Sequence, residues 1–356
     1  MDIAVAVLVI DDLVQGEIVD AGAEFLGVFA DALQDPFDLA EIPCQEGGDP
    51  AGFPEVKRLE HNSLSFYNHG LIMSKHLCIF KVMYKDFYHF KEHPFNITSD
   101  PEFFFPALRH EEAFSHLIYG ISSRRGIIVI TGEIGTGKTT LCRTLLNRLD
   151  KSVKTALILN PDFSDLQLLQ MIINDLGISY VKKTKLDLIG AITLFLVEES
   201  GKGNNVAVVI DECQNLNIRQ LEQIRLLSNL ETEKEKLLQI ILVGQPELSE
   251  KLKKPELRQL TQRVSVNYHI LPLQKEEVGR YINHRLRIAG ACPELMFTPR
   301  AIDAIYEISK GTPRVINVIC DRALLAGFTR ETFTIDRNLV EESAKEILTA
   351  SYEYHS

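Results

Sequence analysis

The sequence lacks the features that mark several classes of protein. Its six cysteines form no C-x-x-C pair and no regular spacing, and no H-E-x-x-H occurs, so neither a disulfide framework nor a zinc-hydrolase motif is indicated. No apolar run approaches the roughly 18–20 residues that a membrane-spanning helix needs. These absences predict a globular, cytoplasmic protein with reduced cysteines and no transmembrane segment of its own.

An excess of positive charge is also missing from most of the chain. Residues 83–356 hold 35 acidic and 34 basic side chains, which disfavours a protein that grips a nucleic-acid backbone. Residues 1–82, in contrast, hold 14 acidic and 4 basic side chains, contain no motif and are interrupted by proline and glycine. Two interpretations of this acidic segment stay open: a genuine N-terminal extension, or a wrongly assigned start with translation beginning at Met83.

The clearest positive signal is a phosphate-binding loop that fits G-x-x-x-x-G-K-[ST]. With the residue that follows it, the loop comprises Gly132, Glu133, Ile134, Gly135, Thr136, Gly137, Lys138, Thr139 and Thr140. Its glycines let the backbone aim N–H groups at phosphate oxygens, while the lysine reaches the β- and γ-phosphates and the Thr139 hydroxyl binds Mg²⁺. An apolar strand pattern precedes the loop and a helical pattern follows it, as this motif requires. The loop therefore predicts binding of ATP with Mg²⁺.

A second acidic motif follows the apolar run at 206–210. Asp211 and Glu212 come directly after it, in the pattern of a Walker B strand. A buried parallel strand delivers such residues at its carboxyl end, beside the phosphate-binding loop. Asp211 is predicted to hold Mg²⁺ through water, and Glu212 to orient and deprotonate the attacking water.

Further polar residues follow the remaining strand patterns. Gln245 comes just after the apolar run at 238–243, where a side chain can reach the γ-phosphate or the attacking water, although an ordinary turn glutamine is the alternative. Arg258 and Arg263 precede a possible strand at 264–271.

The order of these elements predicts an α/β fold with a parallel five-stranded sheet sandwiched by helices. The strands are expected at 126–131, 155–159, 206–210, 238–243 and 264–271. From residue 274 onward the periodicity is helical, and Thr298-Pro299 and Thr312-Pro313 predict helix starts in which a capping hydroxyl precedes proline. We divide the chain into residues 1–82, an aromatic-rich segment at 83–123, a nucleotide-binding core at 124–271 and an α-helical lid at 272–356.

The aromatic-rich segment is dense in large rings. Between residues 84 and 105 it holds eight of them: Tyr84, Phe87, Tyr88, Phe90, Phe95, Phe103, Phe104 and Phe105. Packing beneath the nucleotide domain is the first interpretation, because aromatic side chains usually serve cores. The second is that some of the rings line an adenine pocket, and both can hold for different rings.

Taken together, the motifs resemble those of the AAA+ ATPases, and more narrowly the general secretion pathway protein A (ExeA-type) ATPase family. The segments that carry this resemblance are Phe87–Phe95, Asp100–Phe104, Gly132–Thr140, Asp211–Leu216, Leu242–Leu248 and Gly311–Asn317. The resemblance extends over residues 83–356, about three quarters of the chain, and none of these segments lies in residues 1–82. In the secretion protein a membrane-spanning helix and a periplasmic peptidoglycan-binding domain follow the ATPase, whereas this chain ends before either, so we expect a shorter form of the family.

The resemblance implies further residue roles. Gln245 takes the sensor 1 role and Arg314 the sensor 2 role, while Asn160 stands where a residue restrains the catalytic glutamate. Arg258 or Arg263 would be an arginine finger inserted into a neighbouring subunit of a homo-oligomer, unless each only forms a surface ion pair.

The resemblance also implies a function. We expect a Mg²⁺-dependent ATPase that serves a bacterial envelope secretion, pilus or exopolysaccharide export system, peripheral at the inner membrane through a partner. The alternative is a DNA-associated ATPase of the transposition-helper or helicase-loader type, for which the near-neutral charge balance is unfavourable.

Overall fold

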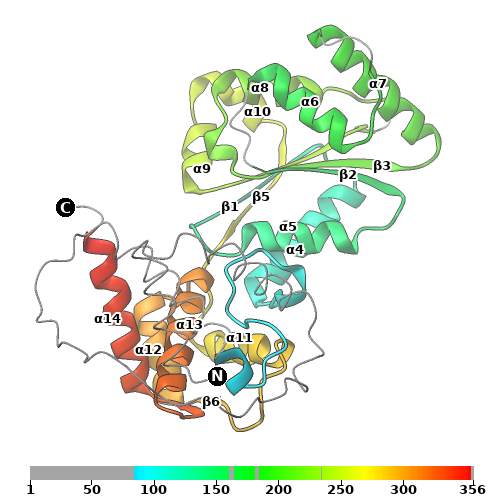
Figure 1. Ribbon diagram of the computed structural model, residues 1–356. Helices are drawn as coiled ribbons and strands as arrows, with labels where there is room; N and C mark the ends of the chain where they lie inside the picture. Colours follow the sequence, from blue (N-terminus) through cyan, green and yellow to red (C-terminus); the bar gives the residue numbers. More distant parts are fainter. Residues whose placement is uncertain (1–83, 160–163, 181–183, 234, 354–356) are drawn as a thin grey trace, which may run out of the picture. The chain divides into compact units, whose positions relative to one another are not determined.

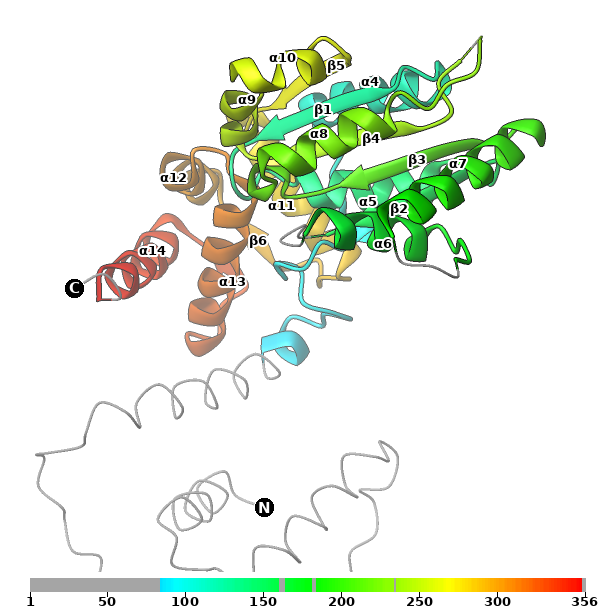
Figure 2. The ribbon, with the colours of Figure 1, turned by 90° about the horizontal axis from the view of Figure 1, so that it is seen from above.

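Five parallel strands form one sheet in the order β2-β3-β4-β1-β5. The computed structural model describes residues 84–159, 164–180, 184–233 and 235–353, all within one compact unit. The strands are β1 (Ile127–Gly132), β2 (Val153–Ile158), β3 (Asn205–Ile210), β4 (Gln239–Gly244) and β5 (Val264–Ile270). Figure 2 shows β1 and β3 running in the same direction. The predicted parallel five-stranded sheet is thus confirmed, including the possible fifth strand.

Helices cover both faces of the sheet. They are α4 (Leu108–Ser122), α5 (Lys138–Arg148), α6 (Asp165–Asp175), α7 (Lys185–Gly201), α8 (Ile218–Leu227), α9 (Pro246–Leu252) and α10 (Arg258–Thr261). Alternate side chains of a strand enter different clusters: Ile127 and Val129 pack with α6 to α10, whereas Ile128 and Ile130 pack with α4 and α5. Figure 1 shows these two layers on opposite sides of the strands. Burial on both faces explains why β1, β3 and β4 are continuous apolar runs.

The lid contains four helices and a short two-stranded sheet. The helices are α11 (Lys275–Ile288), α12 (Pro299–Ser309), α13 (Pro313–Thr329) and α14 (Arg337–Glu353), and the strands are β6 (Met296–Phe297) and β7 (Thr334–Ile335). The helical character of this region was predicted, but the two-residue strands were not, because so short an element has no periodicity. Thr298 caps α12 as predicted, whereas Thr312 makes no side-chain cap, so that part of the prediction is wrong.

Most of the eight rings between residues 84 and 105 belong to the lid core. Tyr84, Tyr88, Phe90, Phe95 and Phe103 are buried in a cluster with side chains of α11, α12 and α13. The Tyr84 hydroxyl donates a hydrogen bond to Asp321 Oδ1 at 2.6 Å. The interpretation that these rings pack beneath the nucleotide domain is therefore corrected, because their partners come from the opposite end of the chain.

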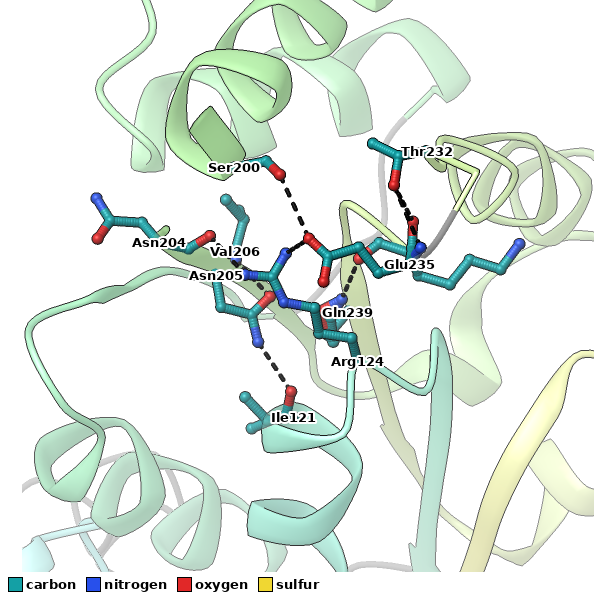
Figure 3. Close-up of polar contacts among 10 residues, drawn as sticks. Ile121, Arg124, Ser200, Asn204, Asn205, Val206, Thr232, Glu235 and Gln239 are labelled. Atoms are coloured by element: carbon teal, nitrogen blue, oxygen red, sulfur yellow. Dashed lines mark hydrogen bonds and ion pairs between the residues drawn. The ribbon is translucent and has the colours of Figure 1, made fainter. Parts of the chain in front are cut away.

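Arg124 links neighbouring segments at the end of the sheet where the strands begin (Figure 3). It lies in the loop before β1 with a left-handed backbone conformation. Its guanidinium donates to Glu235 Oε1 at 2.5 Å and to the carbonyl oxygen of Asn204 at 3.1 Å. Asn205 Nδ2, at the start of β3, donates to the carbonyl oxygen of Ile121 at 2.8 Å. These contacts close the amino-terminal edge and leave the carboxyl ends of the strands for the site.

Candidate functional site

The phosphate-binding loop connects β1 to α5, as the sequence predicts. Gly135 and Gly137 both have left-handed backbone conformations, with φ of 79° and 90°. Such a conformation favours glycine and allows successive N–H groups to point into one concavity. Because Lys138 is the first residue of α5, the loop also ends at the positive end of a helix dipole.

Lys138 folds over its own loop. Its Nζ donates hydrogen bonds to the carbonyl oxygens of Gly132 at 2.8 Å and Glu133 at 2.9 Å. Burial lowers the pKa of Lys138, while the nearby carboxylates of Asp211 and Glu212 act in the opposite direction. The ammonium group is thus held at the mouth of the loop, close to both acidic residues of the second motif.

Thr139 and Asp211 meet between α5 and the end of β3. The Thr139 hydroxyl donates a hydrogen bond to Asp211 Oδ2 at 2.5 Å. Burial raises the pKa of Asp211, whereas the hydrogen bonds from Thr139 and from the Glu212 N–H lower it. A buried carboxylate next to a hydroxyl oxygen is a donor set of the kind that Mg²⁺ prefers. The residues present therefore fit the predicted metal.

Glu212 is held by two glutamine side chains. Gln214 Nε2 donates to Glu212 Oε2 at 2.5 Å, and Gln245 Nε2 donates to the same oxygen at 3.2 Å. The Glu212 backbone is left-handed, with φ of 52° and ψ of 37°. A non-glycine residue in this conformation costs on the order of 1–3 kcal/mol and is found where neighbours over-determine it.

The lid contacts the phosphate-binding loop directly. The Arg314 N–H, in the first turn of α13, donates to the carbonyl oxygen of Gly135 at 3.1 Å. A Cβ atom at Gly135 would lie only 2.6 Å from Arg314 Cβ. The Arg314 side chain is exposed and borders the same cavity as the loop.

A cavity of about 310 Å³ joins these groups. Ile134 to Thr140, Glu212, Gln245 and Arg314 line its phosphate-binding side. Its other side is lined by Ile97, Phe103, Phe104, Phe105 and Tyr281, among others. Three rings of the aromatic-rich segment thus border the cavity, next to the predicted nucleotide site.

Other predicted residues lie outside this lining. Gly132 and Glu133 contribute carbonyl oxygens to Lys138, and Asp211 is reached through Thr139. Arg258 and Arg263 are exposed and do not line the cavity of their own chain. Asn160 lies outside the described residues, as do residues 1–82.

Three contributors escaped the sequence reasoning: Gln214, His110 and Arg285. Gln214 stands inside the Asp211–Leu216 motif, which was the available signal. His110 Nε2 donates to the carbonyl oxygen of Thr136 at 2.8 Å, and burial lowers the pKa of this histidine. Arg285 is buried against the Phe103 ring, with 4.7 Å from its Cζ atom to the ring centroid, and nothing in the local sequence indicated that contact.

The described residues form neither a membrane-spanning helix nor a cluster of metal-binding side chains. No helix in that part of the chain is long and apolar enough to cross a membrane. The same residues contain no cluster of three or more histidine, cysteine, aspartate or glutamate side chains suited to a metal ion.

Sequence comparisons identify two matches. The family model of an AAA domain matches residues 121–252. General secretion pathway protein A of Aeromonas hydrophila is 42% identical over 266 residues, which cover 74% of this chain and 48% of that protein. The chain thus spans about half the length of this curated relative.

Solved structures share the fold at low identity. Cdc6p of Pyrobaculum aerophilum has a TM-score of 0.53 at 18% identity, covering 67% of this chain and 66% of that one. The ORC2 protein of Aeropyrum pernix, in ADPNP-ADP complexes, has a TM-score of 0.52 at 17% identity with the same coverage. Drosophila ORC bound to DNA has a TM-score of 0.50 at 15% identity, covering 83% and 70%. At such identities the likeness shows the fold alone, and it confirms the predicted P-loop arrangement.

Proposed function

Since this chain is an AAA+ ATPase related to General secretion pathway protein A, we propose that its ATP hydrolysis drives assembly or operation of a bacterial envelope export system. The resemblance inferred from the motifs is confirmed by the 42% identity. The export role rests on the name of a relative of which only 48% is matched, so secretion, pilus and exopolysaccharide machines are all compatible systems.

The observation that carries the chemical part is the junction of Thr139, Asp211 and Glu212. The Thr139–Asp211 pair would hold Mg²⁺, which when bound neutralises charge on the β- and γ-phosphates. Lys138 binds phosphate oxygens from the mouth of the loop. Glu212, at the same edge of the sheet, accepts a proton from the attacking water.

The two proposed sensor residues both line the cavity. Gln245 lines the cavity and donates a hydrogen bond to Glu212, so the position of its side chain is coupled to that of the proposed base. Arg314 sits on the loop through its backbone and keeps its guanidinium exposed at the cavity. Closing this arginine on a bound nucleotide would couple the lid to the phosphate state.

The arginine finger is assigned to Arg258 within a homo-oligomer. Arg263 is also exposed, but its positive charge, after the hydrogen bond and charge of Lys236, helps to lower the pKa of Glu231. Arg258 is exposed at the start of α10 and forms no ion pair with any described residue. A guanidinium without an ion-pair partner in its own chain is available to a neighbouring subunit.

The proposed location is cytoplasmic, at the inner membrane through an export partner.

Replacing Glu212 with glutamine tests the proposed chemistry. The E212Q variant should bind ATP as the wild type does and lose roughly 10²–10⁴ of its Mg²⁺-dependent turnover, because the base is gone while the phosphate contacts remain. A fluorescent ATP analogue measures binding, and phosphate release measures turnover with Mg²⁺ and with EDTA. Turnover by E212Q equal to the wild type would sink the assignment of the base.

A separate measurement addresses the export role against the DNA-associated alternative. The fold shared with origin-recognition proteins, one of them bound to DNA, keeps that alternative in view. The near-neutral charge of residues 83–356 is against it. Duplex DNA should leave the wild-type ATPase rate unchanged at low salt. Salt-sensitive stimulation by DNA would favour the alternative.

A further inference from the structure

A side-chain amide in the turn after β3 connects Glu212 to the end of β4. Gln214 Nε2 donates to Glu212 Oε2 at 2.5 Å. The carbonyl oxygen of the same amide, Gln214 Oε1, accepts the backbone N–H of Gln245 at 3.0 Å. Both polar atoms of this one side chain are therefore hydrogen-bonded: Nε2 to the proposed base, and Oε1 to the backbone of Gln245, the residue that follows β4.

The amide has little freedom to leave this position. Gln214 belongs to the 3₁₀ turn Cys213–Asn215, and Lys251 Nζ donates to the backbone carbonyl oxygens of Gln214 at 2.5 Å and Leu216 at 2.7 Å. A Cβ atom at Gly244 would lie 3.0 Å from Gln214 Oε1, so the end of β4 closely abuts the amide. A donor held on both sides loses little rotamer freedom when it binds a carboxylate.

The contacts of the Glu212 carboxylate all fall on one oxygen. Within the described part of the chain, Gln214 and Gln245 both donate to Oε2. Oε1 accepts no hydrogen bond from a described residue, so it is the oxygen left to accept a proton. Because a misplacement of about 1 Å can cost 10²-fold in rate, fixing the rotation of this carboxylate has a direct effect on turnover.

We propose that Gln214 is a positioning residue, which orients the Glu212 carboxylate for proton transfer through its side-chain amide. This inference rests on the proposed function of Glu212 as the base. Gln214 also links that base to Gln245, so a movement at the end of β4 changes the orientation of both residues together.

The test replaces Gln214 with methionine, which has a similar length and no amide. The Q214M variant should lose roughly 10- to 100-fold in kcat while its KM, nucleotide affinity and Tm stay near the wild type, because the amide acts on the base and not on the phosphates. Gln170, a half-buried glutamine on α6 outside the site, provides the matched control: the Q170M variant should retain wild-type kcat.

A double-mutant cycle separates positioning through Glu212 from an independent role. In the E212Q background, Q214M should cause no further loss, because the group that it orients is already absent. An equal loss in both backgrounds, or wild-type kcat for Q214M alone, would overturn the proposal. If Q214M does not fold, Q214N, whose shorter amide cannot reach Oε2, is judged by the same cycle. Undiminished turnover by the single variant E212Q would refute the proposed base. Because Gln214 is unchanged in that variant, the test of the base is separate from the test of Gln214.

Discussion

The backbone N–H of Arg314 donates to the carbonyl oxygen of Gly135 at 3.1 Å, so the first turn of the lid helix α13 rests on the phosphate-binding loop. The approach is close because Gly135 has no side chain: a Cβ atom there would lie 2.6 Å from Arg314 Cβ and 3.4 Å from Thr312 Cγ2. The phosphate-binding loop and the lid therefore contact each other at Gly135.

Replacing Gly135 with alanine should weaken nucleotide binding through this interface. The added methyl group clashes with Arg314, and the left-handed conformation costs an L residue about 1–2 kcal/mol. Gly177 is the matched control, because its φ is 70° and a Cβ atom there would meet nothing within 4 Å. We expect both variants to lose stability in thermal unfolding and only G135A to lose roughly tenfold or more in affinity for a fluorescent ATP analogue. Equal nucleotide affinity for G135A and G177A would contradict a functional contact between loop and lid.

Burial of the His110 ring should make the protein less stable at acidic pH. Burial lowers the pKa of His110, while the bond to Thr136 and the charge of Glu277 act in the opposite direction. An unfolded chain titrates its histidine near 6.5. Below that pH the unfolded chain binds a proton that the folded ring does not, so stability is lost as pH falls from the unfolded value toward the folded one.

The variant H110Q isolates this contribution. Glutamine keeps an N–H that can donate to the Thr136 carbonyl oxygen, and it has no proton to gain. Between about pH 7.5 and 5.5 its Tm should fall less than that of the wild type, with roughly 2–4 °C for each kcal/mol of difference. Parallel Tm curves for the two proteins would show that His110 does not contribute. The comparison is made without nucleotide, since a bound ligand shifts Tm by itself.

Local signals account for the parts of the fold that the sequence predicts. The run from Ile127 to Gly132 and the glycine loop after it are contiguous, and a strand buried on both faces leaves a continuous apolar run. The loop motif thus predicts β1 and α5, which the structure contains, and it also indicates the proposed roles of Lys138 and Thr139. The Thr139–Asp211 contact was also predictable, because parallel strands present their carboxyl ends at one edge.

The contacts that escaped prediction join distant parts of the chain. Tyr84 bonds to Asp321 across 237 residues, and no pattern within the aromatic-rich segment indicates a lid partner. Gln214 was visible in the motif, yet its proposed role depends on the backbone N–H of Gln245, which follows β4, and on the missing Cβ of Gly244. Such roles follow from which strands are neighbours in the sheet and not from spacing along one strand.

Arg258 should act in the active site of a neighbouring subunit, and mixing two inactive variants tests this. R258A should lose roughly 10³–10⁵ in kcat if it is the finger, because the charge that stabilises phosphoryl transfer is removed. K138A should be inactive because its own loop cannot hold phosphate, although it still carries Arg258. Mixed oligomers then contain interfaces in which an intact loop meets an intact finger, so turnover should reappear at a fraction of the wild-type rate. R263A is the control: the positive charge of Arg263 acts on Glu231 of its own chain, where it helps to lower the pKa of that carboxyl, and the variant should retain turnover alone. A different pair of results would show that the finger is Arg263 and that the assignment to Arg258 is wrong. In that case the mixture of R258A and K138A stays inactive, and R263A, inactive alone, regains turnover when it is mixed with K138A.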